Sequence, residues 1–323
     1  MSELDQRLKI ARQISWQHLG KQIKFYLPGI FLLDGISGKY PAASITGERC
    51  ALQCDHCQGK ILRSMLQTET PERLVTQCLE LSKKGQYGVL ISGGCDLSGR
   101  LPWSLYVPAI KEIKKRTNLF ISVHSGLVDA CEAQHLKAAG VDQALIDVVG
   151  DDETFQQIYH VPFGVERIQE SMAALQAAGL PTVPHIVCGL NHGKLRGEKT
   201  AVQMVARFNV EQLAIVSLIG IPGTPMFRVR PPAPEAIADI IADARYLMPS
   251  TAISLGCARQ RGNSRLEILA IDAGVNRMAL PSDEAIAKAK EYGLTIRYQK
   301  TCCSVPNDLS IPNWRSDHTS KGV

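Results

Sequence analysis

Hydrophobic and polar residues follow one another in a regular succession of short and long segments from about residue 42. Short runs rich in β-branched and apolar residues predict buried strands, and longer runs with apolar residues at spacings of three and four predict helices. Helical patterns such as 71–85 and 235–247 separate the strands, which predicts successive parallel βα units. Eight units predict an α/β fold, a (β/α)8 barrel of the TIM type. The eight predicted strands are 43–47, 88–93, 119–124, 144–149, 182–189, 213–219, 252–256 and 277–282.

The predicted barrel leaves a segment at each end of the chain. Residues 1–41 are expected to form an N-terminal extension with one helix and a lid, residues 42–294 the barrel, and residues 295–323 a C-terminal tail. Chemistry in such barrels takes place at the carboxyl ends of the strands. The residues that end the predicted strands, and the loops that follow them, are therefore the first candidates for a functional site.

Composition favours a folded protein of a reducing compartment. Hydrophobic residues make up 45% of the 323 residues, and the net charge of +5 is too small and too scattered to indicate nucleic-acid binding. The charged, amphipathic start of the chain has no secretory or membrane-spanning pattern, so we expect a cytoplasmic protein without a membrane partner. Ten cysteines in that setting are interpreted first as metal ligands or catalytic groups rather than disulfides.

Three cysteines stand within eight residues in the stretch CALQCDHC, at Cys50, Cys54 and Cys57. They follow the first predicted strand directly, where a barrel builds its site. A structural zinc site normally has four protein ligands, and His56 is the nearby candidate for a fourth, so a zinc knuckle is the less favoured alternative. Three thiolates suit a [4Fe–4S] cluster, which is then left with one open iron to bind a substrate or cofactor.

The CxxxCxxC spacing after the first strand of a βα barrel resembles the signature of the radical S-adenosylmethionine (SAM) enzymes. The resemblance implies that Cys50, Cys54 and Cys57 hold a cluster whose open iron chelates SAM, and that SAM is cleaved to a 5′-deoxyadenosyl radical. It also implies that His56 lies near the adenine. For the polar side chains at other strand ends, a structural hydrogen bond is an equal alternative to a cofactor contact. The further cofactor contacts expected are Ser92, Gly93, Gly94, His124, Ser125, Asp147, Gly220 and Pro222.

Other cysteines fall near the barrel mouth or in the tail. Cys257 follows the seventh strand, and Cys302 and Cys303 are adjacent in the tail. A second iron-sulfur cluster held by these three is the preferred interpretation, and structural thiols or an electron-transfer role are the alternatives. Neighbouring side chains of an extended segment point in opposite directions, so the adjacent pair needs a turn to reach one cluster. Cys95 and Cys188 end strands and are positioned to face the mouth.

The stretch from the seventh strand onward is similar in layout to biotin synthase, which implies that Arg259 contacts an auxiliary cluster. Over nearly the whole chain, a set of motifs resembles one component of the bipartite, two-protein lipoyl synthases. These are CALxCxHCxG, LISGG, VHSGLVD, PHIVCGL, IPGTPM, GCAR and TCCS. The resemblance implies a radical SAM sulfurtransferase that inserts sulfur into an octanoyl chain on a lipoyl carrier domain, with an auxiliary [4Fe–4S] cluster as sulfur donor.

The partners implied are an octanoylated lipoyl carrier protein or domain, a second radical SAM subunit, and an electron donor such as ferredoxin or flavodoxin. A basic surface would help to guide an acidic carrier, and 111–116 and the arginine-rich 259–265 are the candidates. For 111–116 a solvated helix face is the favoured alternative. Two alternative functions stay open. One is another biotin-synthase-like radical SAM enzyme, such as a mutase, a carbon–carbon bond-forming enzyme or a methylase, and the other is a non-enzymatic zinc-binding scaffold.

Overall fold

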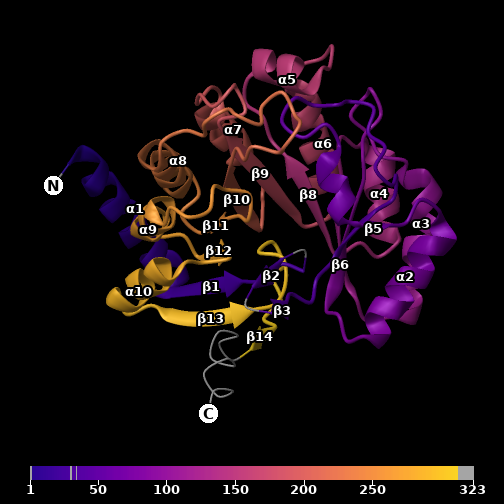
Figure 1. Cartoon of the computed structure of the whole chain (residues 1–323), viewed down its shortest axis with the longest axis horizontal. Helices are drawn as coiled ribbons and strands as arrows, with labels where there is room; N and C mark the ends of the chain where they lie inside the picture. The colour runs from indigo at the N-terminus through magenta and orange to yellow at the C-terminus, as the bar shows by residue number, and fades with distance from the viewer. Residues whose placement is uncertain (1, 30, 34, 312–323) are drawn as a thin grey trace.

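The computed structural model describes residues 2–29, 31–33 and 35–311, and Figure 1 shows their arrangement. The helices in this part of the chain are α1 (Glu3–Leu19), η1 (Lys60–Ser64), α2 (Pro71–Lys83), α3 (Trp103–Arg116), α4 (Ala130–Ala138), α5 (Asp152–Tyr159), α6 (Glu166–Ala177), α7 (Glu198–Val205), α8 (Pro234–Leu247), α9 (Arg265–Asp272) and α10 (Asp283–Glu291). The strands are β1 (Gln22–Tyr26), β2 (Leu32–Leu33), β3 (Ile36–Ser37), β4 (Ala42–Ser44), β5 (Leu66–Gln67), β6 (Gly88–Ser92), β7 (Phe120–His124), β8 (Gln143–Asp147), β9 (Thr182–Cys188), β10 (Gln212–Ser217), β11 (Ala252–Leu255), β12 (Arg277–Ala279), β13 (Thr295–Gln299) and β14 (Ser310–Ile311).

One curved sheet forms the centre of the molecule. Its order is β5-β4-β6-β7-β8-β9-β10-β11-β12-β1-β13-β14, and the ladders between the first eleven of these strands are parallel. Among the described residues, the sheet does not close between β5 and β14, so it is a half-barrel with helices around its outside (Figure 1). The predicted fold of the TIM type is confirmed, and each of the eight predicted strands overlaps a parallel strand of this sheet.

The sheet extends beyond the barrel boundaries expected at 41/42 and 294/295. β1 lies in the N-terminal segment and pairs with β12 on one side and β13 on the other, in register from Lys24 opposite both Arg277 and Arg297. β13 lies in the expected tail. The sequence of β1 suits a strand, because the apolar residues Ile23 and Phe25 alternate with the polar residues Gln22 and Lys24. In the structure Ile23 and Phe25 are fully buried. The helix expected in the N-terminal segment is α1, while the lid stays a prediction.

Three helices that follow strands of the sheet begin at residues that cap them. Thr70, Asp129 and Asp151 accept hydrogen bonds through their side chains from main-chain N–H groups three residues later, which starts α2, α4 and α5. Capping fixes where the loop ends and the helix begins. The loops that follow β7 and β8 are therefore short and well defined at the positions where site residues are expected.

Two buried aromatic residues of α3 donate hydrogen bonds to the loops that follow β7 and β4. The Trp103 indole Nε1 donates to the Ser125 carbonyl at 2.8 Å, just after β7, and the Tyr106 hydroxyl donates to the Ile45 carbonyl at 2.8 Å, just after β4. Both side chains are buried almost completely, so these hydrogen bonds form away from water and hold the loops in one position.

No helix in the described part of the chain is long and apolar enough to cross a bilayer.

Candidate active site

The loop after β4 carries three cysteines and is folded back on itself by main-chain turns. The N–H groups of Cys57 and Gln58 both donate to the Cys54 carbonyl, at 3.0 and 2.8 Å, and Gln58 takes a left-handed φ of 45°. Ala51 N–H donates to the Cys95 carbonyl at 2.7 Å, which ties this loop to the one after β6. The turns bring Cys50, Cys54 and Cys57 to one cavity.

The end of α5 anchors the same loop from the other side. Asp55 N–H donates to the Ile158 carbonyl at 3.0 Å, and the Asp55 carboxylate lies 2.9 Å from His160 Nε2. His160 ends α5 with a left-handed φ of 57°. His56 packs its ring against Tyr159, with ring centroids 5.3 Å apart. The cysteine loop is therefore fixed by contacts with a helix that begins about 100 residues later in the sequence.

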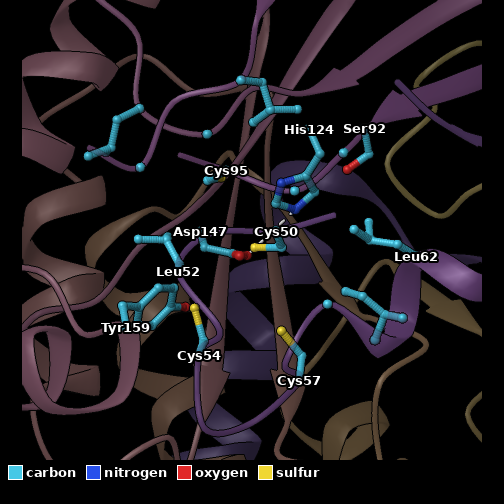
Figure 2. A pocket seen from close by; sticks show the side chains of 18 of the residues that line it. Cys50, Leu52, Cys54, Cys57, Leu62, Ser92, Cys95, His124, Asp147 and Tyr159 are labelled. Atoms are coloured by element: carbon cyan, nitrogen blue, oxygen red, sulfur yellow. Dashed lines mark ion pairs between the residues drawn. The ribbon is translucent and has the colours of Figure 1, made fainter. Parts of the chain in front are cut away.

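A cavity of about 200 Å³ opens at the carboxyl ends of β4, β6, β7 and β8. Figure 2 shows the thiol groups of Cys50, Cys54 and Cys57 directed into it, and Asp147 lines the same cavity. Of the residues predicted for the cofactor site, the cavity brings together the three cysteines, His56, Ser92, Gly93, Gly94, His124 and Asp147.

The cavity fits a three-thiolate cluster with a polar cofactor. A Cβ on Gly94 would lie 2.0 Å from the Arg49 carbonyl oxygen and 2.5 Å from Cys50 Cα, so only glycine allows this close approach. His56 Nδ1 and Tyr159 Oη are buried and have no hydrogen-bond partner within the described residues, as expected where a polar ligand supplies one. No three Cys, His, Asp or Glu side chains of the described ranges converge on a single metal ion. A cubane binds its three thiolates through three different irons and does not need such convergence.

Cys54 and Cys57 share a hydrogen bond that favours a thiolate at Cys57. Donation from Cys54 lowers the pKa of the Cys57 thiol to about 4 in spite of its burial, and the neighbouring His56 adds to this effect. The same hydrogen bond, together with burial, raises the pKa of Cys54. Burial also raises the pKa of Cys95, beside Cys50. At neutral pH the loop therefore presents a thiolate, which is the form of cysteine that binds a metal.

Polar residues from β7 and β8 lie across the cavity from the cysteine loop. His124 Nε2 is 3.6 Å from Asp147 Oδ1, and both side chains are about one-third exposed, so they can exchange water for a ligand. Ser125 differs from the other expected contacts because its hydroxyl donates to the main-chain carbonyls of Leu145 and Gly126 and does not line the cavity. The cofactor contact expected of Ser125 stays a prediction.

A second group of thiols assembles from distant parts of the chain. Cys257 follows β11, and Cys302 and Cys303 follow β13, so all three lie at carboxyl ends of parallel strands. Cys257 packs against a buried cluster formed by Tyr26, Ala279 and Cys303. The adjacent cysteines lie in a turn, closed by Val305 N–H donating to the Cys302 carbonyl at 3.1 Å. This is the turn that the sequence requires if both thiols are to reach one cluster.

The thiols of this second group alter one another's pKa values. Donation from Cys303 lowers the pKa of Cys302 to about 6 against the effect of burial, with help from the Ser304 hydroxyl, which donates to Cys302 Sγ at 3.2 Å. Burial and the charge at Cys302 raise the pKa of Cys257 to about 11. His124 also acts on Cys302, which places the second group within electrostatic range of the first cavity.

Two buried hydroxyl groups lie beside the second group. Tyr26 Oη has no hydrogen-bond partner within the described residues, and its ring packs in the cluster that contains Cys303. Ser254 Oγ lies beside the Cys303 thiol and interacts with it. A buried hydroxyl without a partner is costly, and a group with sulfide or thiolate acceptors would satisfy it. The donor set and these hydroxyls fit an auxiliary iron-sulfur cluster, whose presence stays a prediction.

Arg259 anchors the loop that carries Cys257. Its guanidinium is almost completely buried, pairs with Glu267 at 2.7 Å, and donates to the carbonyls of Gly256, Ala279 and Leu280 at 2.5 to 2.9 Å. Its donors are therefore satisfied within the protein. Arg261, two residues later, donates to the Cys257 carbonyl at 2.8 Å and keeps 40% of its side chain exposed. The cluster contact expected of Arg259 stays a prediction.

The proline-glycine loop after β10 lies against the cysteine loop. Lys60 Nζ, at the start of η1, donates to the Pro222 carbonyl at 3.1 Å, and Gly220 lines a second cavity of about 930 Å³ beside the first. Ile61, in η1, and Met65, directly after it, line both cavities and form the wall between them. The cofactor contacts expected of Gly220 and Pro222 stay predictions.

Sequence reasoning missed one residue of the first cavity. Tyr159 lines that cavity with its hydroxyl group buried, and burial, together with the nearby Asp147, Cys54 and Cys57, raises the pKa of this hydroxyl. No signal in the sequence indicates this role, because Tyr159 reads as an ordinary apolar position of α5. Cys95 lines the first cavity as its position at the end of β6 suggests, whereas Cys188 is fully buried and lines neither cavity.

Two family models match adjacent parts of the chain. The radical SAM superfamily matches residues 44–198, which include the first cysteine group, and the Biotin and Thiamin Synthesis associated domain matches residues 214–307, which include the second. Among curated proteins, biotin synthase of Alkalilimnicola ehrlichii is 27% identical over 154 residues, or 47% of this chain and 46% of that protein. Biotin synthase of Synechococcus sp. is 23% identical over 242 residues, or 70% of each chain. The first of these matches thus spans about half the length of its relative.

Solved structures share the fold over most of the chain. A crystal structure of methylornithine synthase superposes with a TM-score of 0.63 at 15% identity, covering 92% of this chain and 90% of that one. HydG, a maturase of the [FeFe]-hydrogenase, gives a TM-score of 0.63 at 16% identity, covering 92% and 69%. At these identities the likeness concerns the fold alone. The family matches imply a [4Fe–4S] cluster and SAM, in agreement with the three-thiol cavity. Residues 44–198 therefore form a radical SAM domain, and this domain, the associated domain and the biotin synthase relatives together identify a radical SAM, biotin-synthase-like protein.

Proposed function

We propose that this protein is a radical SAM sulfurtransferase of the lipoyl synthase type, which inserts sulfur into an octanoyl chain on a lipoyl carrier domain. A second radical SAM subunit would add the other sulfur, and ferredoxin or flavodoxin would supply electrons. The observation that carries this proposal is the second thiol group, Cys257, Cys302 and Cys303, at the same barrel mouth as the first. A sulfur-inserting enzyme needs a sulfur source near the carbon that is activated, and a mutase does not.

The residues of the first cavity have distinct roles in this proposal. Cys50, Cys54 and Cys57 would hold the cluster, and the main chain at Gly93 and Gly94, which line the same cavity, would face SAM. Glycine at 94 lets this turn pack directly against Arg49 and Cys50 of the cysteine loop. His124 and Asp147 offer a hydrogen-bonding pair for its polar groups. When bound, the cluster and SAM supply the radical that removes a hydrogen atom from an unactivated carbon.

The residues of the second group would hold the auxiliary cluster and protect it from water. Cys302 has a lowered pKa and is ready to bind iron at neutral pH, and the turn at Cys302–Val305 keeps Cys303 beside it. The buried Arg259 and Glu267 ion pair fixes the loop that positions Cys257. The hydroxyls of Tyr26 and Ser254 would donate to the sulfur atoms of the cluster.

An anaerobic reaction with an octanoylated lipoyl domain tests the proposal. The reconstituted protein is given SAM, dithionite and the carrier domain, and the carrier is analysed by mass spectrometry. We expect an added sulfur on the octanoyl chain and about eight irons per chain, since two cubanes are needed. About four irons, with SAM cleavage but no thiolated product, would instead indicate another biotin-synthase-like reaction, such as a rearrangement, carbon–carbon bond formation or methylation.

A further inference from the structure

The second cavity is a basic groove beside the active site. It opens between the loops after β10 and β11 and has a volume of about 930 Å³. Four of its lining residues are arginines, and none of its described lining residues is acidic. We refer to it as the arginine groove, and its arginines are Arg228, Arg230, Arg259 and Arg261. A concave surface with charge of one sign concentrates the electrostatic field and attracts ligands of the opposite sign.

Two of these guanidinium groups are available for a partner. Arg228 and Arg230 are exposed, and neither forms an ion pair with any residue in the described ranges. Arg261 donates to two main-chain carbonyls and lies 3.7 Å from the buried Glu267 carboxylate, but it stays 40% exposed. Burial beside Arg259 lowers its pKa to about 10, which still leaves it charged at neutral pH. Unpaired guanidinium groups bind carboxylates through two parallel hydrogen bonds.

The walls of the arginine groove are apolar. Ile219 and Phe227 are 37% and 43% exposed, and Ile61, on η1, is 46% exposed. Large apolar side chains seldom stay this exposed without a partner when they gather on one surface. Ile61 also lines the cavity that contains the first cysteine group, and Cys257 lies in the groove itself. A ligand in the groove therefore lies beside Cys257 of the second thiol group, with Ile61 between it and the cavity of the first.

The other basic surface considered from the sequence, residues 111–116, lies at the end of the sheet opposite the thiol groups. Residues 111–116 form the C-terminal part of α3, which leads into the amino end of β7, whereas both thiol groups lie at carboxyl ends of strands. Lys114 and Arg116 are already paired, with Asp142 and Glu112 at 2.8 and 2.7 Å. Of the two surfaces considered from the sequence, only the stretch 259–265 borders the site.

We propose that the arginine groove is the docking surface for the substrate-bearing partner, an acidic carrier domain with an acyl chain on a flexible arm. Carboxylates of the carrier would pair with Arg228, Arg230 and Arg261, and the aliphatic chain would pass over Ile219 and Phe227 towards Cys257. The charge of the groove selects the acidic face, and its apolar walls select the chain. This inference rests on the proposed function, because it takes its occupant from there.

Association kinetics of a purified octanoylated lipoyl domain test the inference. The double variant Arg228→Glu, Arg230→Glu should lower the association rate constant at least about 10-fold at low ionic strength, with the difference shrinking as salt is added. The matched control is Lys111→Glu, Lys115→Glu, which changes the net charge equally at two exposed, unpaired lysines of the opposite end and should change the rate constant less than about 2-fold. Thermal unfolding of each variant verifies that it is folded.

Three outcomes decide the inference. A loss confined to the groove variant supports it. An equal loss in both variants, or no loss in either, overturns the docking inference. If the wild-type protein still adds sulfur to the carrier, the proposed function stands without the arginine groove. Failure of the wild-type protein to associate with the carrier or to add sulfur to it overturns the proposed function and the groove together.

Discussion

The two thiol groups of this protein are built in opposite ways. Cys50, Cys54 and Cys57 lie on one loop, within eight residues, and tight turns suffice to bring them together. Cys257 and the pair Cys302 and Cys303 are more than forty residues apart and meet only because β11, β12, β1 and β13 are neighbours in the sheet. A local group depends on loop sequence, and an assembled group depends on the packing of the barrel. The two should therefore respond differently to mutation.

The largest effect is expected from removing a thiol of the local group. Cys54→Ala should reduce formation of 5′-deoxyadenosine to the level seen without enzyme, because two thiolates do not hold a cubane with one open iron. The measurement is chromatography of the anaerobic reaction with dithionite and SAM. Cys131→Ala removes an exposed thiol of α4 that belongs to neither group and serves as the control. Cleavage of SAM by the Cys54 variant at the control rate would refute the assignment.

Removing a thiol of the assembled group should separate SAM cleavage from product formation. Cys303→Ala should keep the cleavage of SAM but lose the thiolated product, and its iron content should fall from about eight to about four per chain. Iron analysis and mass spectrometry of the carrier, on one preparation, provide both measurements. The buried Cys78 offers a control for lost packing, since it lies in α2 away from both groups. If Cys303→Ala makes product normally, the second group is structural.

The ion pair beneath the assembled group should contribute strongly to stability. Arg259→Met leaves the Glu267 carboxylate buried without its main partner, so the free energy of unfolding should fall by about 3–5 kcal/mol. Urea denaturation of the apoprotein measures it. Arg261→Met is the matched comparison, because that side chain is 40% exposed and lies 3.7 Å from the same carboxylate, and it should cost about 1 kcal/mol or less. Equal losses of unfolding free energy in the two variants would show that the burial of Arg259 does not account for its contribution to stability.

The smallest effect is expected from His185, a histidine of β9 that lies next to His124. His185 lies with its ring centroid 5.8 Å from that of His124, and burial lowers its pKa from 6.5 to about 4. In the unfolded chain, His185 takes up a proton as pH falls below about 6.5, whereas in the folded protein it does so only near pH 4. Stability from this group is therefore complete above pH 6.5 and is lost as pH falls towards 4.

The variant His185→Gln isolates that contribution. Between pH 7 and pH 5, the wild-type protein should lose about 2 kcal/mol more of its unfolding free energy than the variant does. Urea denaturation at the two pH values, on both proteins, gives the difference directly. Parallel losses in the two proteins would mean that His185 is protonated in the folded state and that the barrel interior is wetter than its burial indicates.

Much of the site follows from local sequence, and the rest does not. The spacing of Cys50, Cys54 and Cys57 and the glycines after β6 identify the first cavity, because ligands on one loop and glycine at a close approach are local requirements. Tyr159 could not be found in this way, since it reaches the cavity only through the contacts between α5 and the cysteine loop. Ser125 shows the converse, because a residue at the correct strand end has its hydroxyl turned to the main chain.

The alternation of apolar and polar residues by itself determined the eight strands, their parallel connection and the position of the first cysteine group, because strand period and loop spacing are properties of neighbouring residues. Only the tertiary structure decided that β1 and β13 join the sheet, that Cys302 and Cys303 turn to meet Cys257, and that unpaired arginines gather in one groove. Those features depend on which strand edges pair across hundreds of residues, and sheet pairing over such distances leaves no periodic signal in the sequence.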